Sequence, residues 1–196
     1  IEDYTFFYCE SLTSITIPNN VTYVGNCAFG YCDNLSAVTF GNNVTTIDDY
    51  AFAGCSSLSS VTIPASVSYI GYSTFASCNS LNSIVVESGN TAYDSRNNCN
   101  AIIETASNTL ITGCQSTIIP ETVTTIGDEA FYGCDGLTTI VIPNSVTSIG
   151  YSAFANCDSL SSVDLGNGVT TISGSAFEYC YAMTSVTIPA SVTEIG

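Results

Sequence analysis

The feature that most constrains this chain is a repeat of 23 residues that runs through most of its length. The unit is clearest from Leu58 to Ser80, where it reads LSSVTIPASVSYIGYSTFASCNS. A repeat of this length is typical of a solenoid, in which each coil buries its apolar side against its neighbours. Coils with the same starting position begin at Leu12, Leu35, Leu58, Leu81, Cys114, Leu137, Leu160 and Met183. We predict a single array over residues 1–196, interrupted by an irregular 33-residue coil at 81–113.

Two apolar positions recur near the start of each coil and alternate with Ser or Thr, as Val61 and Ile63 do in the unit above. This alternation predicts a short β-strand with one buried face. Pro64 follows, and a proline cannot donate to a strand ladder, so it marks the end of the strand. A second apolar pair, Val67 and Ile70, predicts a second short strand that stacks into a second parallel sheet.

Each coil closes with the motif Ala-Phe-x-x-Cys, as at Ala51, Phe52 and Cys55. This spacing of small and large residues predicts a single helical or 3₁₀ turn on the outer side of the solenoid. Seven cysteines share the last position of the motif, namely Cys9, Cys32, Cys55, Cys78, Cys134, Cys157 and Cys180. We interpret them as small buried hydrophobes, because side chains that run parallel along a ladder neither converge on a metal nor point at each other. A thiolate row that binds metal and a chain of disulfides are the alternatives.

The charge composition excludes several classes of partner. The chain has 17 acidic residues, one basic residue (Arg96) and no histidine, which gives a formal net charge of −16. Nucleic acids and anionic membranes require Lys and Arg to neutralise phosphate, so we expect neither as a partner. No apolar run is long enough to span a bilayer, so we expect no membrane insertion by this segment. Because the histidine-based catalytic arrangements are absent, we predict no catalytic residue, cofactor or metal.

One group of acidic residues follows the cysteine of the closing motif and comprises Glu10, Asp33, Asp135 and Asp158. We interpret this group as a solvated edge that keeps the array soluble. Carboxylates one coil apart that hold a calcium ion are the alternative.

The irregular coil carries Arg96 beside Tyr93 and Asp94. Apolar stretches on either side of residues 106–108 predict a β-hairpin that extends from the solenoid. We interpret Arg96 as a partner of Asp94 or of backbone carbonyls that holds the coil together. In the alternative, the hairpin with Tyr93 and Arg96 forms one rim of a binding face.

Cysteines outside the shared position need a separate interpretation. Cys99 and Cys114 flank the second part of the irregular coil, and we expect two separately buried thiols, with a bridge between them as the alternative. We expect Cys27 to be exposed and unpaired.

One column of side chains points outward from the first predicted sheet. It comprises Thr16, Thr39, Thr62, Val85, Ile118, Val141, Asp164 and Thr187. An exposed apolar stripe often marks an interaction site, and Val85, Ile118 and Val141 form such a stripe unless the hairpin covers it. The candidate partner-binding residues are therefore Val85, Ile118, Val141, Asp164, Tyr93 and Arg96.

The whole chain follows the pattern LxxIxIPxxVTxIGxxAFxxC and in this resembles the BspA-like, or Treponema-type, leucine-rich repeat of bacterial and protist surface proteins. The resemblance implies a right-handed solenoid with a parallel sheet on its concave side. It also implies an extracellular or cell-surface location and, for several members, adhesion to host matrix proteins or to other cells. The chain departs from the pattern at Thr74, Thr117 and Cys114.

These observations favour a non-enzymatic cell-surface or secreted module that binds a protein or glycan partner. The alternative is a structural spacer or self-associating repeat stalk that presents another domain. The chain starts and stops inside a repeat, so we expect it to be a piece of a longer array. No segment with a polar outer face closes either end, and solenoids need such caps, so we also expect end-to-end self-association.

Overall fold

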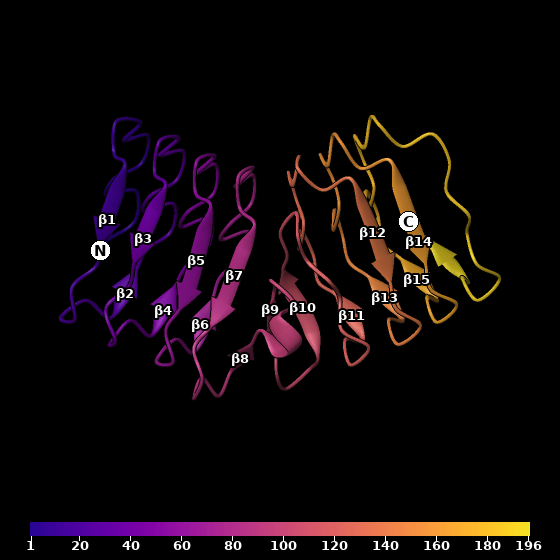
Figure 1. Cartoon of the computed structure of the whole chain (residues 1–196), viewed down its shortest axis with the longest axis horizontal. Coiled ribbons are helices and arrows are strands. Elements are labelled where there is room, and N and C mark those ends of the chain that lie inside the picture. The colour runs from indigo at the N-terminus through magenta and orange to yellow at the C-terminus, as the bar shows by residue number, and fades with distance from the viewer.

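The computed structural model describes residues 1–196 and shows a solenoid of short parallel strands (Figure 1). Strands of the first series follow the start of a coil and comprise β1 (Ser14–Thr16), β3 (Ala37–Thr39), β5 (Ser60–Ile63), β7 (Ser83–Val86), β12 (Thr139–Ile142) and β14 (Ser162–Leu165). Strands of the second series comprise β2 (Tyr23–Val24), β4 (Thr46–Ile47), β6 (Tyr69–Ile70), β11 (Thr125–Ile126), β13 (Ser148–Ile149), β15 (Thr171–Ile172) and β16 (Glu194–Ile195). Both predicted strands of the repeat are therefore confirmed. No helix in the structure is long and apolar enough to cross a membrane.

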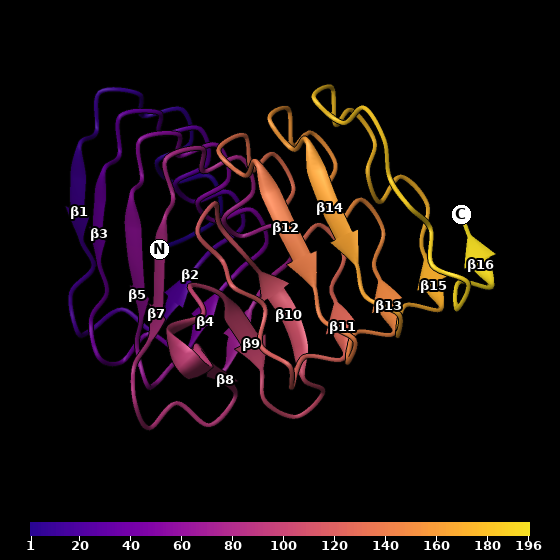
Figure 2. The ribbon, with the colours of Figure 1, turned by 45° about the vertical axis from the view of Figure 1, so that its right-hand side comes forward.

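Neighbouring coils pair residue by residue at the repeat spacing, so that Val61 lies opposite Ile84 and Ile149 lies opposite Ile172. The first series is not one continuous sheet, because its strands pair only as β1–β3, β5–β7 and β12–β14. The first three strands of the second series form the sheet β2–β4–β6. The other four join β8 (Tyr93–Asp94), β9 (Ile102–Glu104) and β10 (Thr109–Thr112) of the irregular coil in a seven-stranded sheet that runs from β16 to β8. Figure 2 shows this larger sheet along one edge of the molecule, from β9 and β10 to β16.

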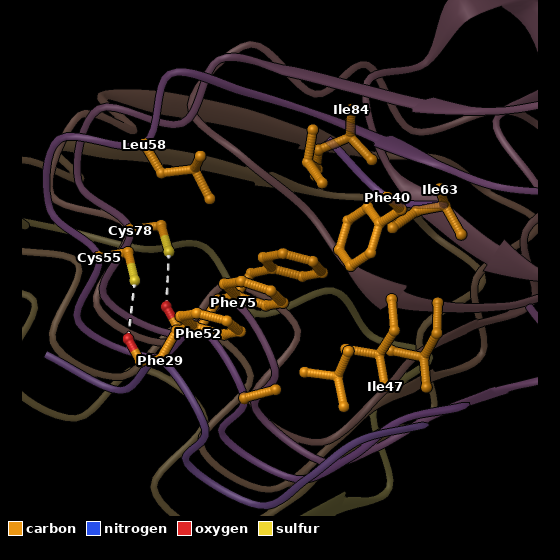
Figure 3. Close-up of a cluster of buried hydrophobic side chains, with 14 of the residues drawn as sticks. Phe29, Phe40, Ile47, Phe52, Cys55, Leu58, Ile63, Phe75, Cys78 and Ile84 are labelled. Carbon is orange, nitrogen blue, oxygen red and sulfur yellow. Dashed lines mark hydrogen bonds between the residues drawn. The ribbon is translucent and has the colours of Figure 1, made fainter. Parts of the chain in front are cut away.

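Stacked phenylalanine rings form the centre of the core (Figure 3). Phe29 and Phe52 stack with ring centroids 5.1 Å apart and an interplanar angle of 4°. The first file contains Phe6, Phe29, Phe52 and Phe75, and the second contains Phe131, Phe154 and Phe177. Ring spacings of 4.8–5.6 Å are close to the roughly 4.8 Å between paired strands, so one ring per coil fills the interior without a gap.

Most cysteines of the closing motif are part of this core. The Cys55 thiol donates a hydrogen bond to the carbonyl oxygen of Phe29 in the preceding coil at 3.2 Å, and Cys78 donates to Phe52 at 3.3 Å (Figure 3). Cys157 makes the same bond to Phe131 at 3.1 Å. A cysteine thus fills a small apolar space and also supplies a donor to a buried carbonyl.

All ten cysteines are free thiols. The interpretation of the shared cysteines as small buried hydrophobes is confirmed for Cys32, Cys55, Cys78 and Cys157, whereas Cys134 and Cys180 are half-buried and Cys9 is exposed. Cys99 and Cys114 are each about 1% exposed and form no bridge. Cys27 differs from the prediction because it is half-buried, and burial raises the pKa of its thiol.

The closing motif folds as tight turns in place of the predicted helical or 3₁₀ turn. The Gly30 N–H donates to the Cys27 carbonyl at 3.0 Å, and the Cys32 N–H donates to the Phe29 carbonyl at 3.3 Å. However, Cys27 and Tyr31 have positive φ angles of 50° and 56°, which a right-handed helix does not allow. The only helix is η1 (Arg96–Asn98), a 3₁₀ turn in the irregular coil.

The irregular coil also contains β8 (Tyr93–Asp94), β9 (Ile102–Glu104) and β10 (Thr109–Thr112), which lie between β6 and β11 in Figure 1. The predicted hairpin exists, since Ile103 pairs with Leu110 in antiparallel register. It does not extend from the solenoid, however, because β9 and β10 are internal strands of the seven-stranded sheet.

This coil lacks the closing motif, so the closing turn at 74–78 lies directly beside the one at 130–134. The Ser77 N–H donates to the Tyr132 carbonyl at 3.0 Å across this junction, which we call the seam. Gly113 lies between the two files of phenylalanines, where its N–H donates to the Ala130 carbonyl at 2.7 Å. The buried side chains accordingly form two clusters, of 25 and 23 residues, that meet at the irregular coil.

Replacement of Gly113 by alanine tests this packing. A Cβ atom at Gly113 would lie 2.1 Å from the Phe131 ring, so we expect Gly113→Ala to lower the free energy of unfolding by about 1–3 kcal/mol through overpacking. The control is Gly174→Ala, whose Cβ would meet the Tyr151 ring at an ordinary 3.6 Å. Urea denaturation of both variants measures the difference, and equal effects would show that the seam is not tightly packed.

Candidate interaction surface

The outward face of the first strand series carries most of the predicted site. Val85, Ile118 and Val141 have exposed fractions of 45%, 77% and 64%. The hairpin leaves all three uncovered, because β9 and β10 belong to the other sheet. These large apolar side chains are therefore exposed to solvent. A partner that covered them would bury apolar surface.

The stripe does not run over three paired strands. Residues 117–119 form no strand, and the Ile118 N–H donates to the Cys99 carbonyl of the irregular coil at 3.1 Å. Thr117 fits the buried position because its hydroxyl donates to the Asn100 carbonyl at 2.7 Å. Val141 and Asp164, in contrast, lie directly opposite each other on β12 and β14.

A groove of about 600 Å³ opens over this pair of strands. Its lining includes Val141, Asp164 and Thr187 from the outward column, together with Asn144 and Asn167 from the turns that follow the strands. We call these five residues the strand-face groove. It combines an apolar contact, a carboxylate and two amides, which is suited to a partner that has both apolar and hydrogen-bonding groups.

Tyr93 does not belong to the site, and this part of the prediction is wrong. Its side chain is 6% exposed, and its hydroxyl oxygen accepts a hydrogen bond from the Ile70 N–H at 3.0 Å. Tyr93 lies 12 residues after Leu81, as Ile70 lies 12 residues after Leu58, so it occupies a core position of the second strand series. Burial raises the pKa of its phenol.

Arg96 connects parts of the irregular coil to each other, in agreement with the prediction that it pairs with Asp94 and holds the coil together. Its guanidinium donates to both carboxylate oxygens of Asp94, with an Nε–Oδ1 distance of 2.8 Å and an Nη2–Oδ2 distance of 2.7 Å. Nη1 donates to Asn108 in the hairpin turn at 2.9 Å and to Thr122 in the next coil at 3.2 Å. The hydrogen bond with Asp94 raises the pKa of Arg96 further above its usual value. The only basic side chain is therefore already paired.

Several acidic residues have structural roles that the sequence did not reveal. Asp49 accepts a hydrogen bond from the Tyr72 N–H at 2.7 Å, and Asp128 accepts one from the Tyr151 N–H at the same distance. Asp135 is one of the acidic residues that follow the cysteine of the closing motif, and it accepts a hydrogen bond from the Asn79 amide at 2.7 Å. Burial and the nearby Asp158 raise the pKa of Asp135. No three His, Cys, Asp or Glu side chains are arranged to hold a metal ion, so no ligand set for the alternative calcium site is found.

Tyrosines form a further exposed surface that was not predicted from the sequence. Nine of the 12 tyrosines are exposed, namely Tyr4, Tyr8, Tyr31, Tyr50, Tyr69, Tyr72, Tyr151, Tyr179 and Tyr181. Pairs from successive coils meet, since the Tyr8 and Tyr31 rings stack at 5.0 Å and the Tyr50 and Tyr72 rings lie 6.1 Å apart. The high tyrosine content was the available signal, but these residues do not keep to one column of the repeat.

Comparison with known proteins agrees with the architecture. A family model described as "BspA type Leucine rich repeat region" matches residues 1–109 and 104–196, with six copies. No curated protein matches the chain. The leucine-rich-repeat solenoid predicted from the sequence is therefore confirmed.

Three solved structures illustrate the similarity. A leucine rich cell surface protein from Faecalibacterium prausnitzii A2-165 has a TM-score of 0.82 and 33% identity over 100% of this chain and 52% of that protein. The pneumococcal vaccine antigen PcpA has a TM-score of 0.81 and 25% identity over 95% of this chain and 47% of the antigen. A leucine rich repeat protein from T. pallidum has a TM-score of 0.53 and 25% identity over 93% and 70% of the two chains. The chain thus spans about half the length of the first two proteins.

The contacts of Arg96 predict a stabilising pair. We expect Arg96→Ala to lower the free energy of unfolding by about 1–2 kcal/mol, because hydrogen bonds between charged groups in a half-buried site contribute on this order. Asp94→Ala should have a smaller effect, because Arg96 keeps its hydrogen bonds to Asn108 and Thr122. The double variant should lose less than the sum of the two single variants, because both remove the same ion pair. Urea denaturation of the three variants measures the coupling, and additive losses would show that Arg96 and Asp94 act independently.

Proposed function

Because the chain belongs to the BspA-type leucine-rich repeat family, we propose that it is a cell-surface or secreted interaction module that binds a protein or glycan through the strand-face groove. Repeat proteins of this family are generally non-enzymatic. The similar protein from Faecalibacterium prausnitzii is described as a cell surface protein, which supports the proposed location.

The observation that carries the proposal is the exposure of Ile118 and of Val141, which lies directly opposite Asp164. In the first two paired strands the outward positions hold Thr16 and Thr39, so that part of the face is weakly polar. At Ile118 and Val141 the same face exposes branched apolar side chains next to a groove. Burial of such side chains against a partner is favourable by about 25 cal/mol per Å² of apolar surface, and Asp164 and the two asparagines can fix the orientation of that partner.

A spacer or self-associating stalk is the second candidate function. It is favoured by the regular stacking of the coils, in which neighbouring strands pair residue by residue and build an elongated array. In this interpretation the strand-face groove remains free.

A binding experiment separates the two functions. We expect the double variant Ile118→Asp with Val141→Asp to bind at least about tenfold more weakly than the wild type, because truncated or charged hot-spot positions cost more than about 1 kcal/mol each. The matched control is Thr62→Asp, which adds a charge at the same outward position of β5. The probes are a panel of purified extracellular-matrix proteins and a glycan array.

Circular dichroism should be the same for all three proteins, because the altered side chains are exposed. Binding to one probe that is lost in the double variant and kept in Thr62→Asp supports the interaction module. Binding that is unchanged in the double variant, or no binding by the wild type to any probe, supports the spacer. Unfolding of the double variant would show that Ile118 and Val141 belong to the core.

A further inference from the structure

A depression of about 190 Å³ lies on the side of the molecule formed by the closing turns. Tyr31, Tyr50 and Tyr132 line it together with the carboxylate of Glu129. Small residues complete the lining, namely Ala53, Gly54, Ala76 and Ser77. None of these residues belongs to the strand-face groove.

The seam brings these residues together. Ser73 and Glu129 are 56 residues apart in the sequence, yet the Ser73 hydroxyl donates a hydrogen bond to the Glu129 carboxylate. The turns are held side by side by the hydrogen bond from the Ser77 N–H to the Tyr132 carbonyl. This arrangement exists only because the irregular coil has no closing turn of its own, so the regular repeat does not produce it elsewhere in the chain.

Gly54 allows the first tyrosine to line the depression. Its φ angle of 73° is in the region that favours glycine, and a Cβ atom there would lie 2.7 Å from the Tyr31 ring. The Tyr31 ring therefore lies directly against the backbone of the next coil. Ala53 and Ala76 are too short to fill the space between Tyr31, Tyr50 and Tyr132, so the ring surfaces remain accessible.

The depression is electronegative. Glu129 has no cationic partner, because the only basic side chain, Arg96, is paired with Asp94. Burial, and after it the charge of Glu129, raises the pKa of both Tyr50 and Tyr132. Burial, and after it the nearby Glu129, also raises the pKa of the Tyr72 phenol. The hydrogen bond from Ser73 leaves further acceptor capacity on the carboxylate, which has about four lone-pair sites.

We propose that this depression binds the guanidinium group of an arginine side chain of a partner protein. A planar guanidinium stacks on aromatic rings and forms paired hydrogen bonds with a carboxylate, and the depression offers three tyrosines and one carboxylate. Attraction between a cation and a ring contributes about 0.5–1 kcal/mol at an exposed site and about 2 kcal/mol when the cation is desolvated. The net charge of −16 adds a long-range attraction for such a partner.

The test uses small probes so that contacts elsewhere on the partner do not matter. N-acetyl-arginine amide is titrated into the intact chain at physiological salt, and N-acetyl-citrulline amide serves as its uncharged analogue of nearly equal shape. The chain has no tryptophan, so its fluorescence comes from its 12 tyrosines, among them the three that line the depression, and the variants below assign the change to this place. We expect the arginine probe to bind at least about tenfold more tightly than the citrulline probe.

Variants locate the binding. Glu129→Gln keeps an oxygen acceptor for Ser73 and should weaken the arginine probe by about fivefold or more, whereas Tyr132→Ala should weaken it by about threefold or more through loss of a ring. Tyr132→Phe keeps the ring and should bind within about twofold of the wild type. Glu10→Gln, at an exposed position outside the depression, controls for the change in net charge and should have no effect.

Two results would overturn the proposal. Equal weakening by Glu10→Gln and Glu129→Gln would mean that only the overall charge attracts the probe. Equal binding of the arginine and citrulline probes would mean that the depression does not recognise a cation. Circular dichroism of each variant confirms that it is folded before its binding is compared.

Discussion

Each coil of this solenoid depends on contact with the next one, because no coil contains enough apolar surface to fold alone. The ordering of one residue costs about 1–2 kcal/mol of backbone entropy, and a coil of 23 residues offers few side chains to offset it. Stacking supplies the rest. One phenylalanine ring and one cysteine thiol per coil lie against the preceding coil, and the thiol donates to the carbonyl of the preceding phenylalanine. The repeat spacing follows from this requirement, because a coil of another length places its ring out of line.

The irregular coil shows what happens when this requirement is not met. It contributes strands to both series but no closing turn, so the file of rings stops at Phe75 and starts again at Phe131. Gly113 occupies the space between, and Arg96 joins Asp94, the hairpin turn and the next coil. The same interruption places the closing turns of two distant coils side by side and so creates the depression around Glu129.

Most of the fold could be predicted from the sequence, because alternating apolar positions and their fixed spacing determine which side chains are buried. Val61, Ile63 and Ile70 are examples. The closing turn was predicted less well, because the residues with positive φ are often Tyr, Ser or Glu and not glycine, so nothing in their chemistry indicates a left-handed backbone. Tyr93 was recognisable as core from its offset, yet its place beside Arg96 suggested a surface role. The Glu129 depression depends on contacts across 56 residues, which no local pattern records.

Hydrogen exchange on Phe154→Ala tests most directly whether stacking between coils stabilises the fold and is interrupted at the seam. Loss of this ring removes stacking partners from Phe131 and Phe177. The account predicts that backbone amides throughout the second cluster, including that of Phe131, exchange faster, while the amide of Phe52 in the first cluster keeps its protection. Faster exchange confined to the coil of Phe154, or an equal increase in both clusters, would contradict it.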